Sequence, residues 1–338
     1  MSISTQELRR AIWPDIAKAP GRVLACRHCE KKNRVAVPTA VLAPESCECG
    51  ACRKPLFLAR DEPLAAIASS SYEHNLDRTA LEALKALPGF STLLRWLMSN
   101  LAERRLRLFS RSTYVECGEE QFPELVALLG RAAKMLDLRF NATLFLGESP
   151  QMNAFTLGTE EPIVVVQSAL LDQLDDAQVT AVLAHELGHI HSEHTLYRWM
   201  AQIIIFGGTR LIPGIGALLT VPLELALLKW SRCAELTCDR AAMLATRDLG
   251  ACLGVELALA GGHRPGTSRR TKMSLRAYIQ QARSLAEQEQ TSTADAVFLA
   301  LMTLGSSHPF AAWRVMHLLD WIEHGNYLDI LAGDYRRI

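Results

Sequence analysis

Two histidines separated by three residues, His185 and His189, constrain this chain more than any other feature of its sequence. They form the pattern H-E-x-x-H, in which Glu186 follows the first histidine. Residues four apart on an α-helix lie on one face about one turn apart, so both rings can reach a single metal ion. The pattern therefore requires a helix. A capping box formed by Asp175 and Gln178 is expected at its start.

A hydrolytic zinc ion needs three protein ligands and one open position, so the third ligand must come from elsewhere in the chain. Glu235, in an apolar helical stretch, is the predicted third ligand. Asp239 lies one turn later and would accept the second ring N–H of a zinc-binding histidine, with His185 as the preferred partner. His191 and His194 are rival third ligands, but we expect both to be exposed residues near the end of the helix.

Glu186 is placed beside the predicted metal and would project toward a water molecule bound there. Zinc lowers the pKa of such a water to about 7, and a carboxylate can then accept its proton as the water attacks a carbonyl. Glu186 is therefore predicted to be the general base of peptide hydrolysis and to pass the proton on to the leaving amine. The alternative is a zinc-binding scaffold that recruits clients or senses redox state and has little proteolytic turnover.

These motifs resemble those of the gluzincin metallopeptidases, specifically the family of HtpX and the CAAX prenyl endoproteases. The resemblance rests on His185-Glu186-x-x-His189 together with Glu235-x-x-x-Asp239, and it extends over about residues 75–325. It implies a mainly helical zincin-type domain that cleaves polypeptides.

The resemblance also implies roles for residues outside the metal motifs. Asn153, Ala154 and Phe155 would lie on an edge strand that holds the substrate backbone as an added strand. His308 would stabilise the negative charge that develops on the attacked carbonyl oxygen, and Arg314 would support it.

Four cysteines near the N-terminus form a second candidate metal site. Cys26-x-x-Cys29 and Cys49-x-x-Cys52 are separated by 19 residues, which is typical of a four-cysteine zinc ribbon. Such a site is closed, so its zinc would be structural. Cys47 is a spare that could replace Cys49, although we favour Cys49.

The predicted fold class is α+β, with a mainly helical metallopeptidase domain, a small antiparallel sheet and the zinc ribbon. β-like runs at residues 143–146, 153–157 and 163–166 predict the sheet as a small meander, and a helix is expected at residues 123–136. The predicted domains are an N-terminal tail (1–20), the zinc ribbon (21–60), a linker (61–74) and the metallopeptidase domain (75–338).

The apolar segment 199–230 has two interpretations. It contains nearly enough apolar residues for a bilayer span, but Pro213, Pro222 and Glu224 interrupt it. It could form a hairpin that dips into a membrane or one that is buried against the peptidase domain. The HtpX relatives carry membrane helices at this place, which favours membrane contact of a peripheral kind.

Composition limits the location and partners of the protein. The formal net charge is +0, so no overall field favours nucleic acid. The first 20 residues lack the apolar run of a secretory signal, which favours a cytoplasmic protein. A polypeptide substrate is the expected partner, and the oligomeric state is left open.

Overall fold

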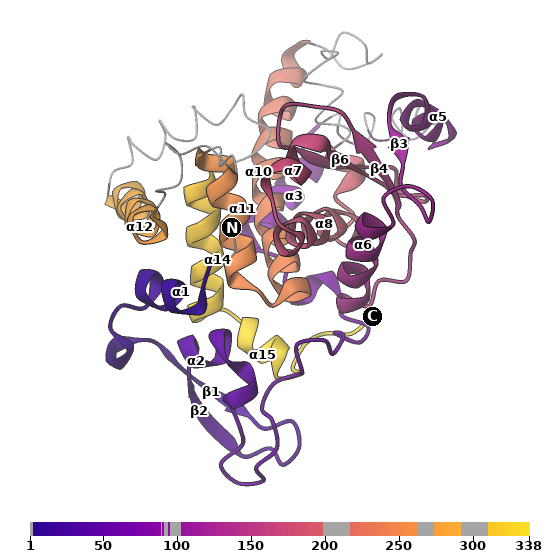
Figure 1. Cartoon of the computed structure of the whole chain (residues 1–338). Coiled ribbons are helices and arrows are strands. Elements are labelled where there is room, and N and C mark those ends of the chain that lie inside the picture. Colours follow the sequence, from indigo (N-terminus) through magenta and orange to yellow (C-terminus); the bar gives the residue numbers. More distant parts are fainter. Residues whose placement is uncertain are drawn as a thin grey trace.

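The computed structural model describes residues 3–88, 90, 94, 103–198, 217–261, 274–291 and 310–338. They form a mainly helical α+β structure with two small sheets (Figure 1). The helices are α1 (Thr5–Ile12), α2 (Val37–Leu42), α3 (Asn75–Lys85), α5 (Glu103–Thr113), α6 (Pro123–Met135), α7 (Ser168–Gln173), α8 (Asp176–His191), α10 (Ala217–Thr246), α11 (Leu249–Gly261), α12 (Leu275–Thr291), α14 (Ala311–His324) and α15 (Tyr327–Leu331). The strands are β1 (Gly21–Ala25), β2 (Lys32–Ala36), β3 (Val115–Glu116), β4 (Thr143–Gly147), β5 (Ala154–Leu157) and β6 (Ile163–Gln167).

Helix α8 carries the H-E-x-x-H pattern and begins with the predicted capping box. The Asp175 carboxylate accepts from the Gln178 backbone N–H at 3.1 Å, and the Gln178 side chain accepts from the Asp175 backbone N–H at 3.0 Å. These two bonds satisfy donors that the first turn of a helix leaves open. The helix lies in the middle of the molecule, where it packs against α6, α10, α11 and β5 (Figure 1).

The main sheet contains the predicted strands, but their arrangement differs from a meander. Its order is β3-β4-β6-β5. Strand β6 inserts between β4 and β5, pairing in parallel with β4 and antiparallel with β5. Every residue of β6 is buried, as expected for a central strand covered on both faces. The prediction of a purely antiparallel sheet was therefore wrong, because burial of the run Ile163–Gln167 favours the central position.

The first 20 residues, which we expected to form a tail, contain helix α1. Leu8, Ile12 and Trp13 are buried, and the Trp13 ring N–H donates to Glu323 at 2.7 Å. The expected linker 61–74 also joins the core, since residues such as Tyr72 within it are fully buried. Both segments thus pack onto the metallopeptidase domain.

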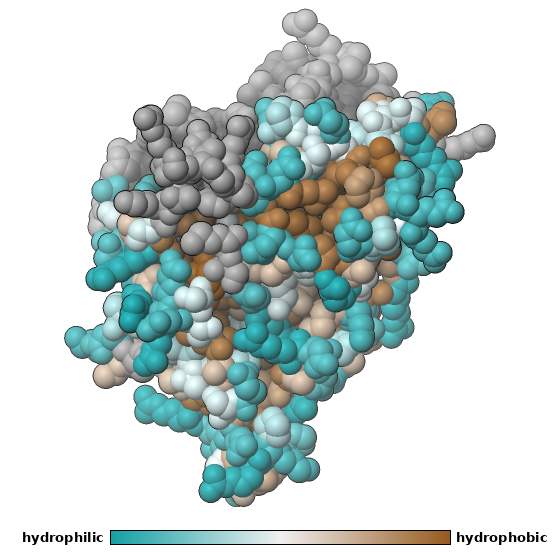
Figure 2. Space-filling model, viewed as in Figure 1, coloured by the Kyte–Doolittle hydropathy of each residue, from teal (hydrophilic) through white to brown (hydrophobic). Residues whose placement is uncertain are grey.

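The cysteine-rich module extends from the body of the molecule at the bottom of Figure 1, next to α15 and away from α8. Strands β1 and β2 pair antiparallel there. An ion pair between Arg22 and Asp329, at 2.6 Å, and a backbone bond from Leu58 to Leu331, at 2.8 Å, join the module to α15. Figure 2 shows that this end is mostly hydrophilic, whereas hydrophobic side chains gather in a band near α7.

The segment 199–230 lies partly outside the described residues, which resume at residue 217 with helix α10. Leu223, Leu227 and Trp230 of α10 are buried and cluster with Ala80 and Leu84 of α3. These three residues of the segment therefore pack against α3, whereas Leu225 of the same helix is 41% exposed. Among the residues that the structure describes, no helix is both long and apolar enough to cross a membrane.

Candidate active site

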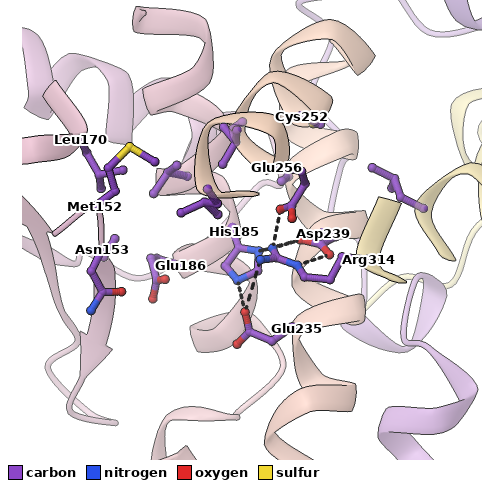
Figure 3. A pocket seen from close by; sticks show the side chains of 17 residues that line it. Met152, Asn153, Leu170, His185, Glu186, Glu235, Asp239, Cys252, Glu256 and Arg314 are labelled. Atoms are coloured by element: carbon purple, nitrogen blue, oxygen red, sulfur yellow. Dashed lines mark hydrogen bonds and ion pairs between the residues drawn. The ribbon is translucent and has the colours of Figure 1, made fainter. Parts of the chain in front are cut away.

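Three side chains from α8 and α10 converge on one point. Glu235 places one carboxylate oxygen 3.3 Å from Nε2 of His185 and the other 3.3 Å from Nε2 of His189. Ligands of a tetrahedral zinc ion, at about 2.0–2.2 Å from the metal, lie about 3.3–3.6 Å from one another. Each Glu235 oxygen is thus as far from its histidine nitrogen as two neighbouring zinc ligands are from each other, and His185 and Glu235 line a pocket (Figure 3).

A glycine allows the two helices to approach this closely. A Cβ atom at Gly188 would lie 2.8 Å from the Cβ of Ala241 and 3.2 Å from the Cα of Cys238, both on α10. Such distances are shorter than van der Waals contact, so a larger residue would push the helices apart. The glycine therefore brings the histidines of α8 within reach of Glu235.

We expect Gly188→Ala to lower the free energy of unfolding by about 1–3 kcal/mol, although alanine is the better helix former. The matched control is Gly130→Ala on α6, where an added Cβ meets nothing within 4 Å. That control should raise stability by about 0.5–1 kcal/mol. Urea unfolding measures both free energies. A stabilised Gly188→Ala protein would show that the close approach of α8 and α10 does not require a glycine at this position.

Negative charge surrounds His185 on two sides. Its Nδ1 lies 3.0 Å from Asp239 and its Nε2 faces Glu235. Burial lowers the pKa of His185, but the hydrogen bonds to Asp239 and Glu235 outweigh burial and raise it to about 9. The surroundings therefore favour a positive charge at this point, which fits a cation-binding site.

Arg314 of α14 joins these carboxylates. Its guanidinium forms a two-pronged ion pair with Asp239, lies 3.0 Å from Glu256 and approaches Glu235 at 3.9 Å (Figure 3). Burial lowers the pKa of Arg314, but the neighbouring carboxylates outweigh burial and raise that pKa well above its usual value. Arg314 also lies 3.4 Å from Nδ1 of His185, so it contacts the candidate metal ligands as well as the carboxylates of Asp239 and Glu256.

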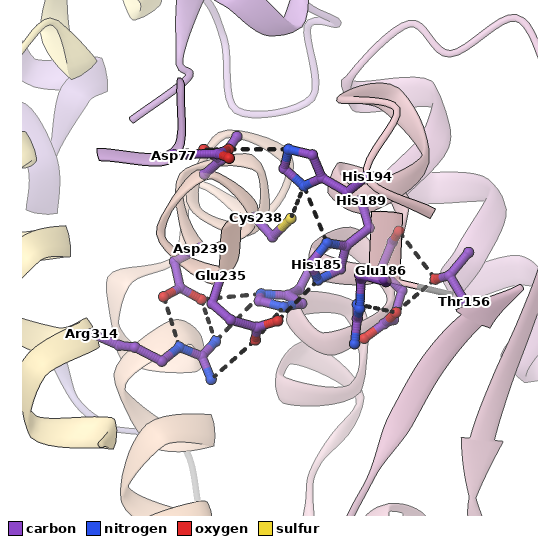
Figure 4. A network of polar contacts seen from close by, with 12 residues as sticks. Asp77, Thr156, His185, Glu186, His189, His194, Glu235, Cys238, Asp239 and Arg314 are labelled. Carbon is purple, nitrogen blue, oxygen red and sulfur yellow. Dashed lines mark hydrogen bonds and ion pairs between the residues drawn. The ribbon is translucent and has the colours of Figure 1, made fainter. Parts of the chain in front are cut away.

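Glu186 lies on the opposite side of the histidines from Arg314 (Figure 4). Its Oε2 accepts from the Thr156 hydroxyl at 2.6 Å and lies 3.6 Å from the Arg198 guanidinium. Glu186 is 3% exposed and lines the pocket. Its carboxylate is therefore held in one orientation beside the candidate metal position.

Strand β5 forms the wall of the pocket next to Glu186. It is the terminal strand of the sheet, as expected from the resemblance. Asn153 and Ala154 line the pocket. Phe155 instead packs on the other face of the sheet with Phe145 and Val165, because successive strand residues point to opposite faces.

The four cysteines of the N-terminal module also converge. Sγ of Cys26 lies 3.7 Å from that of Cys52, and Sγ of Cys29 lies 3.6 Å from that of Cys49. Tetrahedral zinc with Zn–S bonds of about 2.3 Å places sulfurs about 3.8 Å apart. The structure groups Cys49 with the other three cysteines, as predicted, and leaves Cys47 out of this cluster.

The two Cys-x-x-Cys turns, at residues 26–29 and 49–52, have the same backbone geometry. The backbone N–H of Cys26 donates to the carbonyl oxygen of Lys31, and that of Cys49 donates to the carbonyl oxygen of Lys54, each at 2.9 Å. The residue after the second cysteine of each pair has a positive φ, 61° at Glu30 and 62° at Arg53. Backbone N–H groups donate to the Cys49 sulfur and lower its pKa to about 6. Such donors stabilise the thiolate that metal binding requires.

A sequence model of peptidase family M48 matches residues 119–322, more than half of the chain. This chain belongs to peptidase family M48. It is similar to the plastoglobule-localized metallopeptidase 48 of Arabidopsis thaliana, with 31% identity over 80% of this chain and 77% of that protein. It is also similar to protease HtpX homolog 1 of Streptomyces coelicolor, with 30% identity over 42% of this chain and 55% of the relative, and to the protease HtpX homolog of Bacillus velezensis, with 36% identity over 33% and 37%.

As a member of family M48, the protein is a zinc-dependent metallopeptidase that acts on polypeptides.

Cys238 is another side chain that could complete a metal site with the two histidines. Its thiol lies on the Nδ1 side of His189, 3.7 Å from His194, and burial raises its pKa well above the usual value. Glu235 instead faces Nε2 of both histidine rings in this M48 peptidase.

The rival histidines occupy other positions. His191 is half-buried, and its Nδ1 lies 2.8 Å from the hydroxyl of Tyr72. His194 is 2% exposed and lies against His189, so our expectation of an exposed helix-end residue was wrong. His308 lies outside the described residues, and its predicted role stays a prediction.

Four residues of this M48 site were missed in the sequence: Asp77, Thr156, Arg198 and Glu256. Thr156 could have been found, since it follows Ala154 by two positions on a strand and so shares its face. The other three belong to no motif, and only the packing of separate helices brings them to the site.

Proposed function

We propose that this M48 peptidase cleaves peptide bonds at a zinc ion held by His185, His189 and Glu235, with Glu186 as the general base. The observation that carries the proposal is the pair of 3.3 Å contacts between the Glu235 carboxylate and the two Nε2 atoms. When bound, zinc supplies a Lewis acid that polarises a carbonyl and lowers the pKa of water.

Glu186 would accept the proton of the attacking water and deliver it to the leaving amine. Thr156 supports this role because its hydroxyl donates a hydrogen bond to Oε2 of Glu186. The other carboxylate oxygen would then be the one that takes the proton. A fixed carboxylate needs little reorganisation during the reaction.

The substrate backbone would add to the outer edge of β5. Gln167 donates its backbone N–H to Asn153 at 3.0 Å, so Asn153 and Phe155 direct their backbone groups toward β6. Hydrogen-bonded pairs alternate along an antiparallel ladder, so the backbone groups of Ala154 and Thr156 point outward. An extended polypeptide could pair with these groups next to Glu186.

Arg314 would act as a positioning residue in this proposal. Its contacts with Asp239 would hold that carboxylate against Nδ1 of His185 and leave Nε2 of the ring for zinc. The predicted support of an oxyanion by Arg314 and His308 stays a prediction.

The cysteine cluster would hold a second, structural zinc ion. Four thiolates complete a tetrahedral shell and leave no open position for a substrate. Its placement next to α15, away from α8, supports a structural role (Figure 1). Membrane contact by residues 199–230 and a cytoplasmic location also stay predictions.

Metal analysis of the purified protein tests both sites. We expect two zinc ions per chain, since each cluster offers a complete ligand set. The double variant Cys26→Ser/Cys29→Ser should lose one ion, whereas His185→Ala should lose the other together with proteolysis of an unfolded protein. A wild-type protein with a single ion would leave one assignment wrong, and His185→Ala protein that still cleaves would overturn the proposed function.

A further inference from the structure

His194 follows the end of α8 and is enclosed between the candidate zinc site and α3 (Figure 4). Its Nδ1 lies 3.2 Å from Nδ1 of His189, and its Nε2 lies 3.0 Å from the carboxylate of Asp77. The ring also packs edge-on against Trp230. One histidine therefore connects a candidate zinc ligand to a carboxylate on another helix.

Asp77 is held in place at the far end of this connection. It is 0% exposed and accepts from the Trp230 ring N–H at 3.0 Å and from the Thr237 hydroxyl at 2.5 Å. Both partners lie on α10, the helix that carries Glu235. Trp230 can only donate, which fits an Asp77 carboxylate that acts as acceptor.

The proton positions follow from these contacts. Asp77 accepts from Nε2 of His194, so a neutral His194 presents the lone pair of Nδ1 to His189. Two facing nitrogens at 3.2 Å share one proton, and His189 must therefore donate it from Nδ1. Nε2 of His189 is then left without a proton and faces Glu235.

We propose that Asp77 and His194 are positioning residues that hold His189 in the tautomer whose Nε2 binds zinc. This inference rests on the proposed function of the His185, His189 and Glu235 site. Asp239 contacts His185 directly, whereas Asp77 acts on His189 through His194. Helix α3 thus contributes to the metal centre although residue 77 lies outside the stretch 119–322 that the family model matches.

Cys238 does not replace this connection. Its Sγ lies 3.7 Å from Nδ1 of His194, and an S–H group is a weak donor. The lone pair on Nδ1 of His194 therefore accepts its main hydrogen bond from Nδ1–H of His189.

The sharpest variant is Asp77→Asn, which nearly preserves the size of the side chain. An amide N–H₂ facing His194 would move the His194 proton to Nδ1, where it would oppose the Nδ1 proton of His189. A second variant, His194→Phe, keeps an aromatic ring beside Trp230 and removes both nitrogens. His191→Phe is the matched control, because His191 binds Tyr72 instead of a zinc ligand.

The main measurement is zinc affinity by competition with a chelator. We expect Asp77→Asn and His194→Phe to bind zinc at the histidine site about 10–100-fold more weakly than wild type. His191→Phe should bind as wild type does. The zinc of the cysteine cluster, released separately by a thiol reagent, is the internal reference and should not change.

A measurement on the unaltered protein does not depend on whether a variant folds. Nitrogen NMR of the zinc-bound wild type should report a neutral His194 with its proton on Nε2, and a His189 proton on Nδ1. A His194 proton on Nδ1, or unchanged zinc affinity in folded Asp77→Asn protein, would overturn the proposed positioning of His189 by Asp77 and His194. A wild type without zinc at the histidine site would instead overturn the proposed function.

Discussion

Replacement of Glu186 by glutamine should lower kcat/KM for an unfolded protein substrate by about 10²–10⁴-fold while the zinc content stays at the wild-type level. Glutamine keeps the shape of the side chain and can still accept the hydrogen bond from Thr156. It cannot accept a proton at neutral pH, so only the proton-transfer role is removed. Kinetic assay and metal analysis of the same preparation measure the two quantities.

Glu193→Gln is the matched control for this experiment. Glu193 lies two residues past the end of α8 and is exposed, so its replacement should leave both kcat/KM and zinc content unchanged. His185→Ala should lose zinc and activity together, which distinguishes a metal ligand from a general base. Full proteolysis by Glu186→Gln protein would remove Glu186 from the mechanism.

Replacement of Arg314 by methionine should lower the free energy of unfolding by about 3–5 kcal/mol. Arg314 is 6% exposed and ion-paired with Asp239 and Glu256. Methionine fills much of the same space but leaves these carboxyl groups without their partner. Thermal and urea unfolding, each with zinc in excess, measure the loss.

Two further variants show whether the loss comes from unpaired charge. Arg111→Met removes an ion pair with Glu116 in which the side chains are 57% and 40% exposed, and should cost at most about 1 kcal/mol. Adding Glu256→Gln to Arg314→Met should recover part of the stability, because one unpaired carboxylate is removed. Equal losses for Arg314→Met and Arg111→Met would contradict a structural role for this buried ion pair.

Local patterns in the sequence were sufficient to predict the elements that carry the chemistry. The H-E-x-x-H spacing and the capping residues Asp175 and Gln178 predicted α8, and the two Cys-x-x-Cys pairs predicted the cysteine cluster. Within each motif the residues are three or four positions apart, although the two cysteine pairs come from separate parts of the chain. Their geometry follows from the fixed periodicity of a helix or a tight turn.

Long-range packing decided the remaining features. Strand β6 lies between β4 and β5 although β5 comes earlier in the chain, because its apolar run at residues 163–166 is buried best at the centre of the sheet. The N-terminal helix α1 packs into the core, although residues 1–20 were expected to form a tail.

The sequence by itself identified His185, His189 and Glu235 as candidate metal ligands and Glu186 as the candidate general base. Only the tertiary structure decided how those residues are oriented: Thr156 holds Glu186, Arg314 holds Asp239, and Asp77 reaches His189 through His194. These partners are far apart in the chain, and no local period relates them. Their contacts exist because helices α3, α8, α10 and α14 and strand β5 pack around one buried, charged site, where each polar group must find a partner.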